Sequence, residues 1–331
     1  MAYTAIDDPS AYFKVQLHTG DGTAIGAGGQ AVVFDDTDTD MSPDLVWIKS
    51  RNDVHPGEVY DTVRGVTKRI YTTDADAETT NAEGLNTFGS DGFTVGSQDH
   101  VNENTKLFVS YNWLESTTSG LDVVGYTGTG SARTVSHGLG VKPDMISIKR
   151  LDAGGTWHAY HQAITADAVI EPDTQVALKD NANFMNDTEP TTSVFTVNVY
   201  DEVNASSGDF IAHCFAPKQG FSKMGSYEGN GNADGQFIYT GFRPAFVQLK
   251  SVDSTSDWFT FDNKRLGYNV DNNPMLTNAS AAVATTDMID ILSNGFKIRI
   301  ATDPNVAETY IYAAFAEAPF VNSNGVPCNA R

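Results

Sequence analysis

The chain has 331 residues, of which 40% are hydrophobic, and its 42 acidic against 21 basic residues give a formal net charge of −21. This composition excludes disorder over the whole chain, and the acidity disfavours binding to nucleic acid or to anionic membranes. No apolar run approaches the roughly 20 residues that span a bilayer, and the first residues lack the features of a signal peptide. We therefore expect a product made in the cytoplasm, with no membrane insertion.

An internal repeat is the most informative feature. Pro43, Pro143 and Pro244, which are 100 and 101 residues apart, each begin a short strand that ends in lysine. Three further anchors keep this register. They are an aromatic-polar step (Tyr60-Asp61, Tyr160-His161, Phe261-Asp262), a strand that begins at Phe93, Phe195 and Phe296, and a final strand (residues 108–113, 210–215 and 310–315). Four anchors in one register predict three tandem copies of one unit.

The predicted elements follow one order in each unit. A Gly-x-Gly turn comes first, ending at Gly22, Gly130 and Gly231, and eight extra residues follow it in the first unit, within residues 24–40. The next segments are short, alternate apolar with polar residues, and are bounded by turn-forming residues, which is typical of half-buried strands. Asp91-Gly92 and Asn294-Gly295 indicate hairpin turns. The lysine that ends each anchor strand is interpreted as a solvated charge.

Six or seven short strands per unit predict an all-β fold of three tandem β-sandwich or barrel-like repeats of about 100 residues. The predicted units are residues 1–116, 121–216 and 225–320, followed by a C-terminal tail at 321–331, and each is long enough to bury its own core. Cys214 and Cys328 are too few for a disulfide framework.

The three units do not share a recurring set of catalytic residues. The position after the recurring aromatic residue varies between Asp61, His161 and Asp262, which favours a surface or turn role over a shared catalytic acid. Neither a phosphate-binding loop nor a nucleophile elbow occurs. We therefore predict a non-enzymatic protein with no catalytic residues and no cofactor.

Two patterns bear on metal binding. His158 and His161, with His213 farther on, have an odd spacing that puts the first two on opposite faces of a strand, whereas zinc needs three or four convergent ligands. The acidic run 35–40 lacks the glycine and the closing glutamate of an EF-hand. We interpret it as a solvated loop, with a looser surface calcium site as the alternative, and predict no metal site.

Trp157 and Trp258 are the candidates to face a ligand. They occupy equivalent places 101 residues apart. Exposed aromatic rings form stacking platforms for sugars, whereas buried ones build cores, and burial is the commoner outcome for tryptophan. The first unit has Glu58 near that place, so a platform of this kind would not be threefold.

Several segments resemble a repeat that is common in proteins of marine tailed bacteriophages. The segments are residues 8–13, 43–51, 61–65 and 90–96 of the first unit and residues 239–246, 292–296 and 310–320 of the third. The second unit departs most, where residues 191–194 replace the Ser-Asn/Asp-Gly turn. The resemblance implies a virion structural protein, tail or fibre-like, without a defined activity or cofactor.

We therefore expect a peripheral, tail-associated, fibre- or adhesin-like protein of the virion, assembled in the host cytoplasm, with other virion proteins and a host surface glycan or receptor as partners. A head decoration or head-fibre protein and a carbohydrate-binding module are the alternatives, and a polysaccharide-degrading enzyme is least favoured because such enzymes usually form long parallel β-helices. A homo-oligomer and a monomer whose three units mimic a trimer both stay open. Recognition is expected in variable loops such as residues 24–40.

Overall fold

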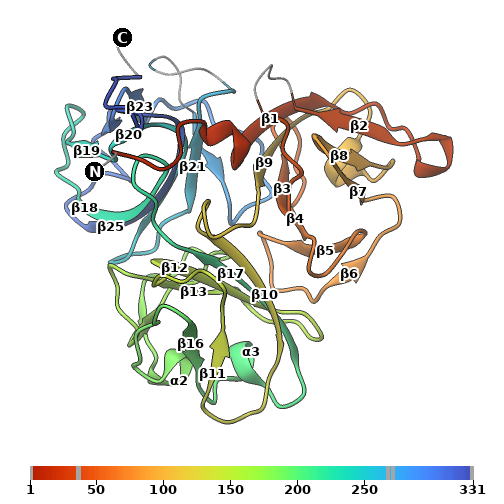
Figure 1. Ribbon diagram of the computed structural model, residues 1–331, viewed down its shortest axis with the longest axis horizontal. Helices are drawn as coiled ribbons and strands as arrows, with labels where there is room; N and C mark the ends of the chain where they lie inside the picture. The colour runs from red at the N-terminus through yellow and green to blue at the C-terminus, as the bar shows by residue number, and fades with distance from the viewer. Residues whose placement is uncertain (1–2, 35–38, 266–268, 270–272, 329–331) are drawn as a thin grey trace.

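The computed structural model describes residues 3–34, 39–265, 269 and 273–328. Three lobes of β-strands surround a common centre, as Figure 1 shows. Strands make up most of the regular structure, which confirms the all-β fold class. We call the lobes units 1, 2 and 3 in chain order. None of the helices in the described part of the chain has the length and apolar character needed to cross a membrane.

The elements of each unit run in the same general order. Unit 1 contains β1 (Phe13–Thr19), β2 (Gln30–Val33), β3 (Leu45–Ser50), β4 (Glu58–Asp61), β5 (Lys68–Tyr71), β6 (Thr79–Thr80), β7 (Leu85–Gly89), β8 (Gly92–Val95), α1 (Asp99–Asn102) and β9 (Leu107–Trp113), with 3-10 turns η1 (Pro9–Ala11) and η2 (Ile25–Ala27). Unit 2 contains β10 (Leu121–Thr127), β11 (Arg133–Ser136), β12 (Met145–Arg150), β13 (His158–His161), β14 (Ala168–Val169), β15 (Lys179–Asp180), α2 (Ala182–Met185), β16 (Val194–Val197), α3 (Asp201–Asn204) and β17 (Asp209–Phe215). Unit 3 contains β18 (Ser222–Glu228), β19 (Phe237–Tyr239), β20 (Phe242–Ser251), β21 (Phe259–Asp262), β22 (Met275–Leu276), β23 (Ile289–Leu292), β24 (Gly295–Ile298) and β25 (Thr309–Pro319), so its first strand begins three residues before the predicted boundary at 225.

Each unit has one large antiparallel sheet with the same strand order. The first strand of the unit pairs with the last, the last pairs with the anchor strand, and the anchor strand pairs with the next strand along the chain. The orders are β1-β9-β3-β4-β5-β6, β10-β17-β12-β13 and β18-β25-β20-β21-β22. The recurring sequence anchors therefore correspond to recurring strand pairings.

A small sheet covers one face of each large sheet. Its strands are β2-β8-β7 in unit 1, β11-β16 in unit 2 and β19-β24-β23 in unit 3. The predicted hairpin turns at Asp91-Gly92 and Asn294-Gly295 are confirmed, since they join β7 to β8 and β23 to β24. In unit 2 the helix α2 stands where the other units have the first hairpin strand, which accounts for the departure at residues 191–194.

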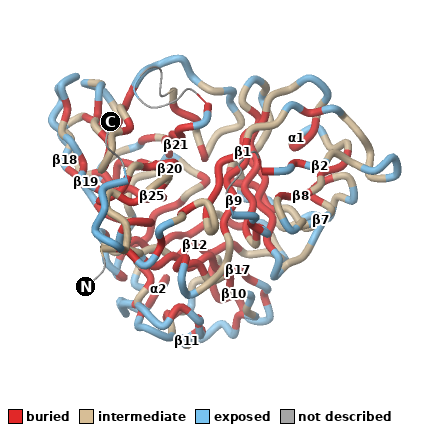
Figure 2. Tube along the Cα trace, turned by 45° about the horizontal axis from the view of Figure 1, so that its top comes forward, coloured by how far each residue is buried: buried red, intermediate tan, exposed pale blue. Residues whose placement is uncertain are grey.

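The large sheets are buried on both faces, because their other faces pack together at the centre. Along β3, Val46 and Ile48 belong to the core inside unit 1, whereas Leu45 and Trp47 belong to a core that all three units share. Figure 2 shows buried residues concentrated where the lobes meet. Our expectation that each unit buries a core of its own is therefore incomplete, since the three units also share this central core.

Three equivalent aromatic residues mark the axis of the central core. Trp113, Phe215 and Phe315 come from the last strand of each unit, and all three rings contact one another. Their centroids are 6.1 Å (Trp113–Phe215), 5.6 Å (Trp113–Phe315) and 5.6 Å (Phe215–Phe315) apart. A triangle of equivalent side chains defines a pseudo-threefold axis within one chain.

An arm from each unit crosses to the next and closes the ring. The arms are residues 72–78, 172–178 and 277–283, which follow β5, the β14 region and β22. Each arm donates a backbone hydrogen bond to the residue that follows the neighbour's anchor strand. These bonds are Glu78 N–Leu151 O (3.0 Å), Leu178 N–Val252 O (2.9 Å) and Val283 N–Arg51 O (3.0 Å). The arm of unit 3 returns to unit 1, so the contacts form a closed cycle.

The lysines of the anchor strands hold these arms. Our interpretation of them as solvated charges is wrong, because Lys49, Lys149 and Lys250 are fully buried. Each ammonium group donates to a carbonyl six residues later in its own unit: His55 O (2.6 Å), Gly155 O (2.6 Å) and Ser256 O (2.8 Å), respectively. Each also donates to the arriving arm: Ser280 O (3.0 Å), Asp74 O (3.3 Å) and Gln175 O (3.1 Å), respectively.

A buried asparagine fixes the Gly-x-Gly turn in every unit. Asn102, Asn204 and Asn305 are fully buried, and the backbone carbonyl of each accepts from the second glycine of the turn. Those glycines are Gly22, Gly130 and Gly231, with φ of 68°, 68° and 64°. A positive φ of this size favours glycine, which explains why the turn motif recurs.

Both ends of the described chain lie on unit 3. The Tyr3 hydroxyl donates to Gly241 O (2.7 Å), and the Asp7 carboxylate accepts from Ser323 N (2.6 Å). The N-terminal segment thus connects unit 1 to unit 3 a second time. Cys214 is buried and Cys328 is exposed.

We predict that Lys250→Met destabilises the whole chain. Methionine keeps the apolar stem but leaves the carbonyls of Gln175 and Ser256 without the ammonium donor, which should lower the free energy of unfolding by about 2–4 kcal/mol. Urea unfolding followed by fluorescence measures this change. Lys264→Met is the matched control because Lys264 is exposed in the same unit. Equal stability of the two variants would contradict the role given to the buried lysine.

Candidate functional site

Trp157 and Trp258, the two candidates for facing a ligand, lie in the interior. Their exposed fractions are 4% and 3%. Each indole N–H donates to a backbone carbonyl of the preceding unit, Trp157 to Tyr71 O (2.6 Å) and Trp258 to Glu171 O (3.0 Å). A ring that stacks on a sugar needs an exposed face. Neither indole is therefore a stacking platform, and both join their unit to its neighbour.

Unit 1 forms the same junction without a tryptophan at this position. Gly57 stands there instead, and a Cβ atom on it would lie only 2.7 Å from Nε1 of Trp47. The indole of Trp47 therefore packs directly against this glycine. The bond to the neighbouring unit comes from the Thr72 hydroxyl, which donates to Thr277 O (2.9 Å).

Of the three histidines considered as metal ligands, two lie at separate junctions between units and one lies inside unit 2. His161 Nε2 lies 3.2 Å from Tyr312 O in unit 3, and His213 Nε2 lies 3.4 Å from Oδ2 of Asp61 in unit 1. His158 is buried inside unit 2. Burial lowers the pKa of His158 and of His161 to about 4, so both rings are neutral at neutral pH.

The position after the recurring aromatic residue is buried in all three units. Asp61 Oδ1 accepts from Arg64 N (2.9 Å), which agrees with the expected turn role, but the position is not on the surface. Burial alone would raise the pKa of Asp61, yet Arg64 and His213 hold it well below the usual range. Unit 3 repeats the pattern, with Arg265 Nε–Asp262 Oδ2 at 2.5 Å and Tyr111 Oη–Asp262 Oδ2 at 2.8 Å. Each aspartate thus pairs with an arginine of its own unit and also contacts a side chain of a neighbouring unit, His213 for Asp61 and Tyr111 for Asp262.

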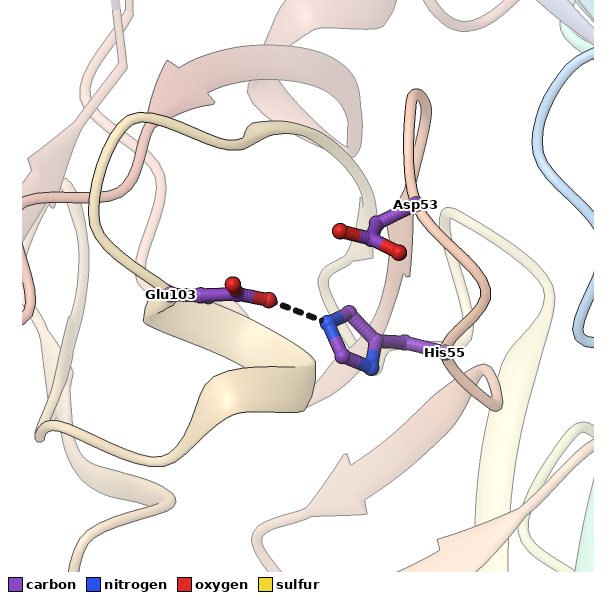
Figure 3. A group of neighbouring side chains, drawn as sticks. All are labelled: Asp53, His55 and Glu103. Atoms are coloured by element: carbon purple, nitrogen blue, oxygen red, sulfur yellow. Dashed lines mark hydrogen bonds and ion pairs between the residues drawn. The ribbon is translucent and has the colours of Figure 1, made fainter.

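Among the residues that the structure describes, one group of three ligand-type side chains comes together. Asp53, His55 and Glu103 place their ligand atoms within 4.8 Å of one another, and His55 Nε2 lies 2.6 Å from Glu103 Oε2 (Figure 3). Asp53 already pairs with Lys106, and that hydrogen bond lowers the pKa of Asp53. A cation would have to displace Lys106 from Asp53 and break the contact between His55 and Glu103. The three side chains are therefore satisfied by their existing ion pairs. In the acidic run 35–40 considered for calcium, residues 35–38 lie outside the described residues.

A cavity of about 110 Å³ lies on the pseudo-threefold axis. Nε1 of Trp47 and Nε1 of Trp113 border it and have no hydrogen-bond partner among the described residues. Buried donors of this kind commonly bind an ordered water, and the volume has room for one. Most of the wall consists of equivalent positions from the three units: Leu45, Met145, Phe246; Trp47, Ser147, Gln248; Trp113, Phe215, Phe315; Thr72, Pro172, Thr277.

Carboxyl groups gather between units 1 and 2. Asp44, Glu115 and Asp122 line a cavity of about 350 Å³ beside the turn that joins β9 to β10. Burial, a hydrogen bond to Asp122 and the charge of that group raise the pKa of Glu115 to about 7. Glu115 therefore keeps its proton over part of the physiological pH range.

Unlike the buried Trp157 and Trp258, two aromatic side chains of β19 are exposed. This strand is an edge strand of the small sheet in unit 3. Phe237 is 43% exposed and Tyr239 is 48% exposed. A cavity of about 380 Å³, bordered by Tyr3 and Lys223 among others, lies beside Tyr239. Sequence reasoning missed these residues, although the alternation Phe237-Ile238-Tyr239 puts both rings on one face of a strand.

A family model described as a domain of unknown function, DUF7483, matches residues 8–319. The chain belongs to this family. No curated protein and no solved structure shows significant similarity to the chain. The match runs through all three units and ends at Pro319, the last residue of β25. The family therefore corresponds to the whole ring, in agreement with the shared central core.

We predict that the Glu115–Asp122 pair makes stability fall as pH rises from about 5 to about 8. Between the unfolded pKa near 4.5 and the folded pKa of about 7, the folded state keeps a proton on Glu115 that the unfolded chain has released. The stabilisation is therefore complete below the unfolded pKa and is lost as pH rises through the folded pKa of about 7. Urea unfolding midpoints at both ends of this range should differ less in Glu115→Gln than in the wild type.

Glu317→Gln is the matched control for this prediction. Glu317 is the equivalent residue of unit 3, and its carboxylate pairs with Arg243 (Nε–Oε2 2.8 Å) rather than with a second carboxyl group. We expect this variant to keep the pH dependence of the wild type. The same pH dependence in Glu115→Gln and in the wild type would rule out the raised pKa of Glu115 as its cause.

Proposed function

We propose that this member of the DUF7483 family is a non-enzymatic structural protein of a bacteriophage virion, peripheral and tail-associated, with a fibre- or adhesin-like role at the host surface. The observation that carries the proposal is how the recurring polar residues are used. Lys49, Lys149 and Lys250 bind backbone carbonyls between units, and the recurring asparagines hold turns. Among the described residues, these recurring lysines and asparagines thus join β-units and hold turns, which is a structural use of polar groups rather than a catalytic one.

Charge supports a position on the outside of a particle. The net charge of −21 repels the phosphates of packaged nucleic acid, so the chain suits contacts with other virion proteins and with solvent. A rigid ring with variable outer loops suits recognition, because binding residues are commonly carried by loops on a fixed scaffold. The resemblance to repeat proteins of marine tailed phages points to the same role.

One observation favours a second candidate, a decoration protein of the head. Arms from the three units close a ring around a pseudo-threefold axis. A ring of this symmetry matches the threefold positions of an icosahedral shell, and the chain would then need no further copies to fill such a position.

We predict that the chain copurifies with intact phage particles. Quantitative mass spectrometry of gradient-purified virions should detect it, and immunogold labelling should place it at the tail. A small copy number per particle supports the tail, and a copy number that scales with the major capsid protein supports the head. Its absence from washed virions, with the protein recovered only from the lysate, would refute both positions.

A further inference from the structure

Equivalent outward positions of the small sheets differ sharply between units. The buried residue of the edge strand pairs with the recurring phenylalanine in every unit: Val32 with Phe93, Val135 with Phe195 and Ile238 with Phe296. The exposed residues on either side are Ala31 and Val33 in unit 1, Thr134 and Ser136 in unit 2, and Phe237 and Tyr239 in unit 3. The fold thus accepts small side chains at these positions, so the two aromatic rings of unit 3 are not required by the framework.

The Phe237 ring lies against a glycine in the neighbouring strand. Gly295 of β24 is the cross-strand partner of Tyr239. A Cβ atom on Gly295 would lie 2.9 Å from Cε2 and from Cζ of Phe237, so this ring packs directly on the glycine backbone. Phe237 is 43% exposed and Tyr239 is 48% exposed, so both rings are accessible to a ligand from solvent. Two residues along a strand span about 6.6 Å, so the two rings form a short platform.

Hydroxyl and amine groups border the platform on its Tyr239 side. The Tyr3 and Tyr239 hydroxyl oxygens are 3.1 Å apart, and Tyr3 also donates to Gly241 O (2.7 Å). Lys223 Nζ donates to Tyr239 O (2.7 Å) and lies 5.6 Å from the centre of the Tyr239 ring. The adjoining cavity of about 380 Å³ is also lined by Gln219, Ser222 and Thr240. Figure 1 shows β19 at the periphery of unit 3, near the N-terminus.

Paired charges border the platform on its Phe237 side. Lys297, the cross-strand partner of Phe237, pairs with Asp234 (2.7 Å). Arg299 pairs with Asp290 (3.3 Å). Hydrogen-bond donors and acceptors therefore both border the rings, and the charges of Lys297 and Arg299 are paired with carboxylates.

We propose that this surface, formed by Phe237, Tyr239 and the cavity lined by Tyr3 and Lys223, binds a neutral glycan. A sugar presents C–H faces that stack on aromatic rings and hydroxyl groups that both donate and accept hydrogen bonds, which matches rings bordered by both kinds of group. The net charge of −21 opposes an anionic polysaccharide. Two rings on a three-residue strand form a platform far smaller than the roughly 800 Å² per partner of a stable protein interface.

The inference rests on the proposed attachment role for its biological setting, but its test uses the purified full chain. Native gels cast with mannan, galactan or laminarin, which are neutral, or with alginate, which is anionic, measure retardation by each polysaccharide. We expect at least one neutral polysaccharide to retard the wild type. The double variant Phe237→Thr/Tyr239→Ser carries the side chains of unit 2 and should fold normally, but it should bind about tenfold more weakly.

Val33→Ser is the matched control, since Val33 is 57% exposed at the position equivalent to Tyr239, and it should bind as the wild type does. Three results would overturn the inference: no retardation by any neutral polysaccharide, equal retardation of the double variant, or retardation by alginate alone. Binding to bacterial envelope vesicles that survives periodate oxidation of their glycans but not protease digestion would also overturn it, in favour of a protein partner. Glycan binding by a protein absent from virions would refute the proposed function alone.

Discussion

A lysine ammonium group held between two units is the interaction on which the ring depends. Removing a charge from water is costly unless hydrogen bonds replace its hydration. For Lys49, Lys149 and Lys250, one carbonyl comes from the same unit and another comes from the arm of a neighbour. A unit without its neighbour would lose the second of these hydrogen bonds, and it would also expose the second apolar face of its large sheet. For both reasons, we expect the three units to fold as one cooperative domain.

The repeated framework is the part of the fold that the sequence predicts well. Period-2 apolar patterns, the Gly-x-Gly turns and the Asp-Gly and Asn-Gly hairpin signals are local, and each describes bonds made within a unit. The burial of the anchor lysines is not local. The partner of Lys49 in the arm of unit 3 is Ser280, which is 231 residues away, so a pattern read along one strand gives only the default of a solvated charge.

Contacts with distant parts of the chain also explain why the sequence did not predict which aromatic residues are exposed. Trp157 looks like a free side chain in sequence because its partner, Tyr71 O, belongs to another unit. Phe237 and Tyr239 look like ordinary strand residues because exposure depends on what covers the small sheet. A comparison of equivalent positions between the three units would have singled them out, since Thr134 and Ser136 show that the edge strand forms without aromatic residues.

Differences between equivalent positions do not all carry the same meaning. At the axis, Trp47, Ser147 and Gln248 differ in size, but they line one cavity, so a large side chain in one unit leaves room for smaller ones in the others. That difference is explained by packing alone. At the outer face of the small sheets no such constraint operates, because solvent accepts any side chain, and large exposed aromatic rings weaken solubility without contributing to the core. An unlike residue at the axis is therefore weak evidence of function, whereas an unlike aromatic pair on the outer face of unit 3 is stronger evidence.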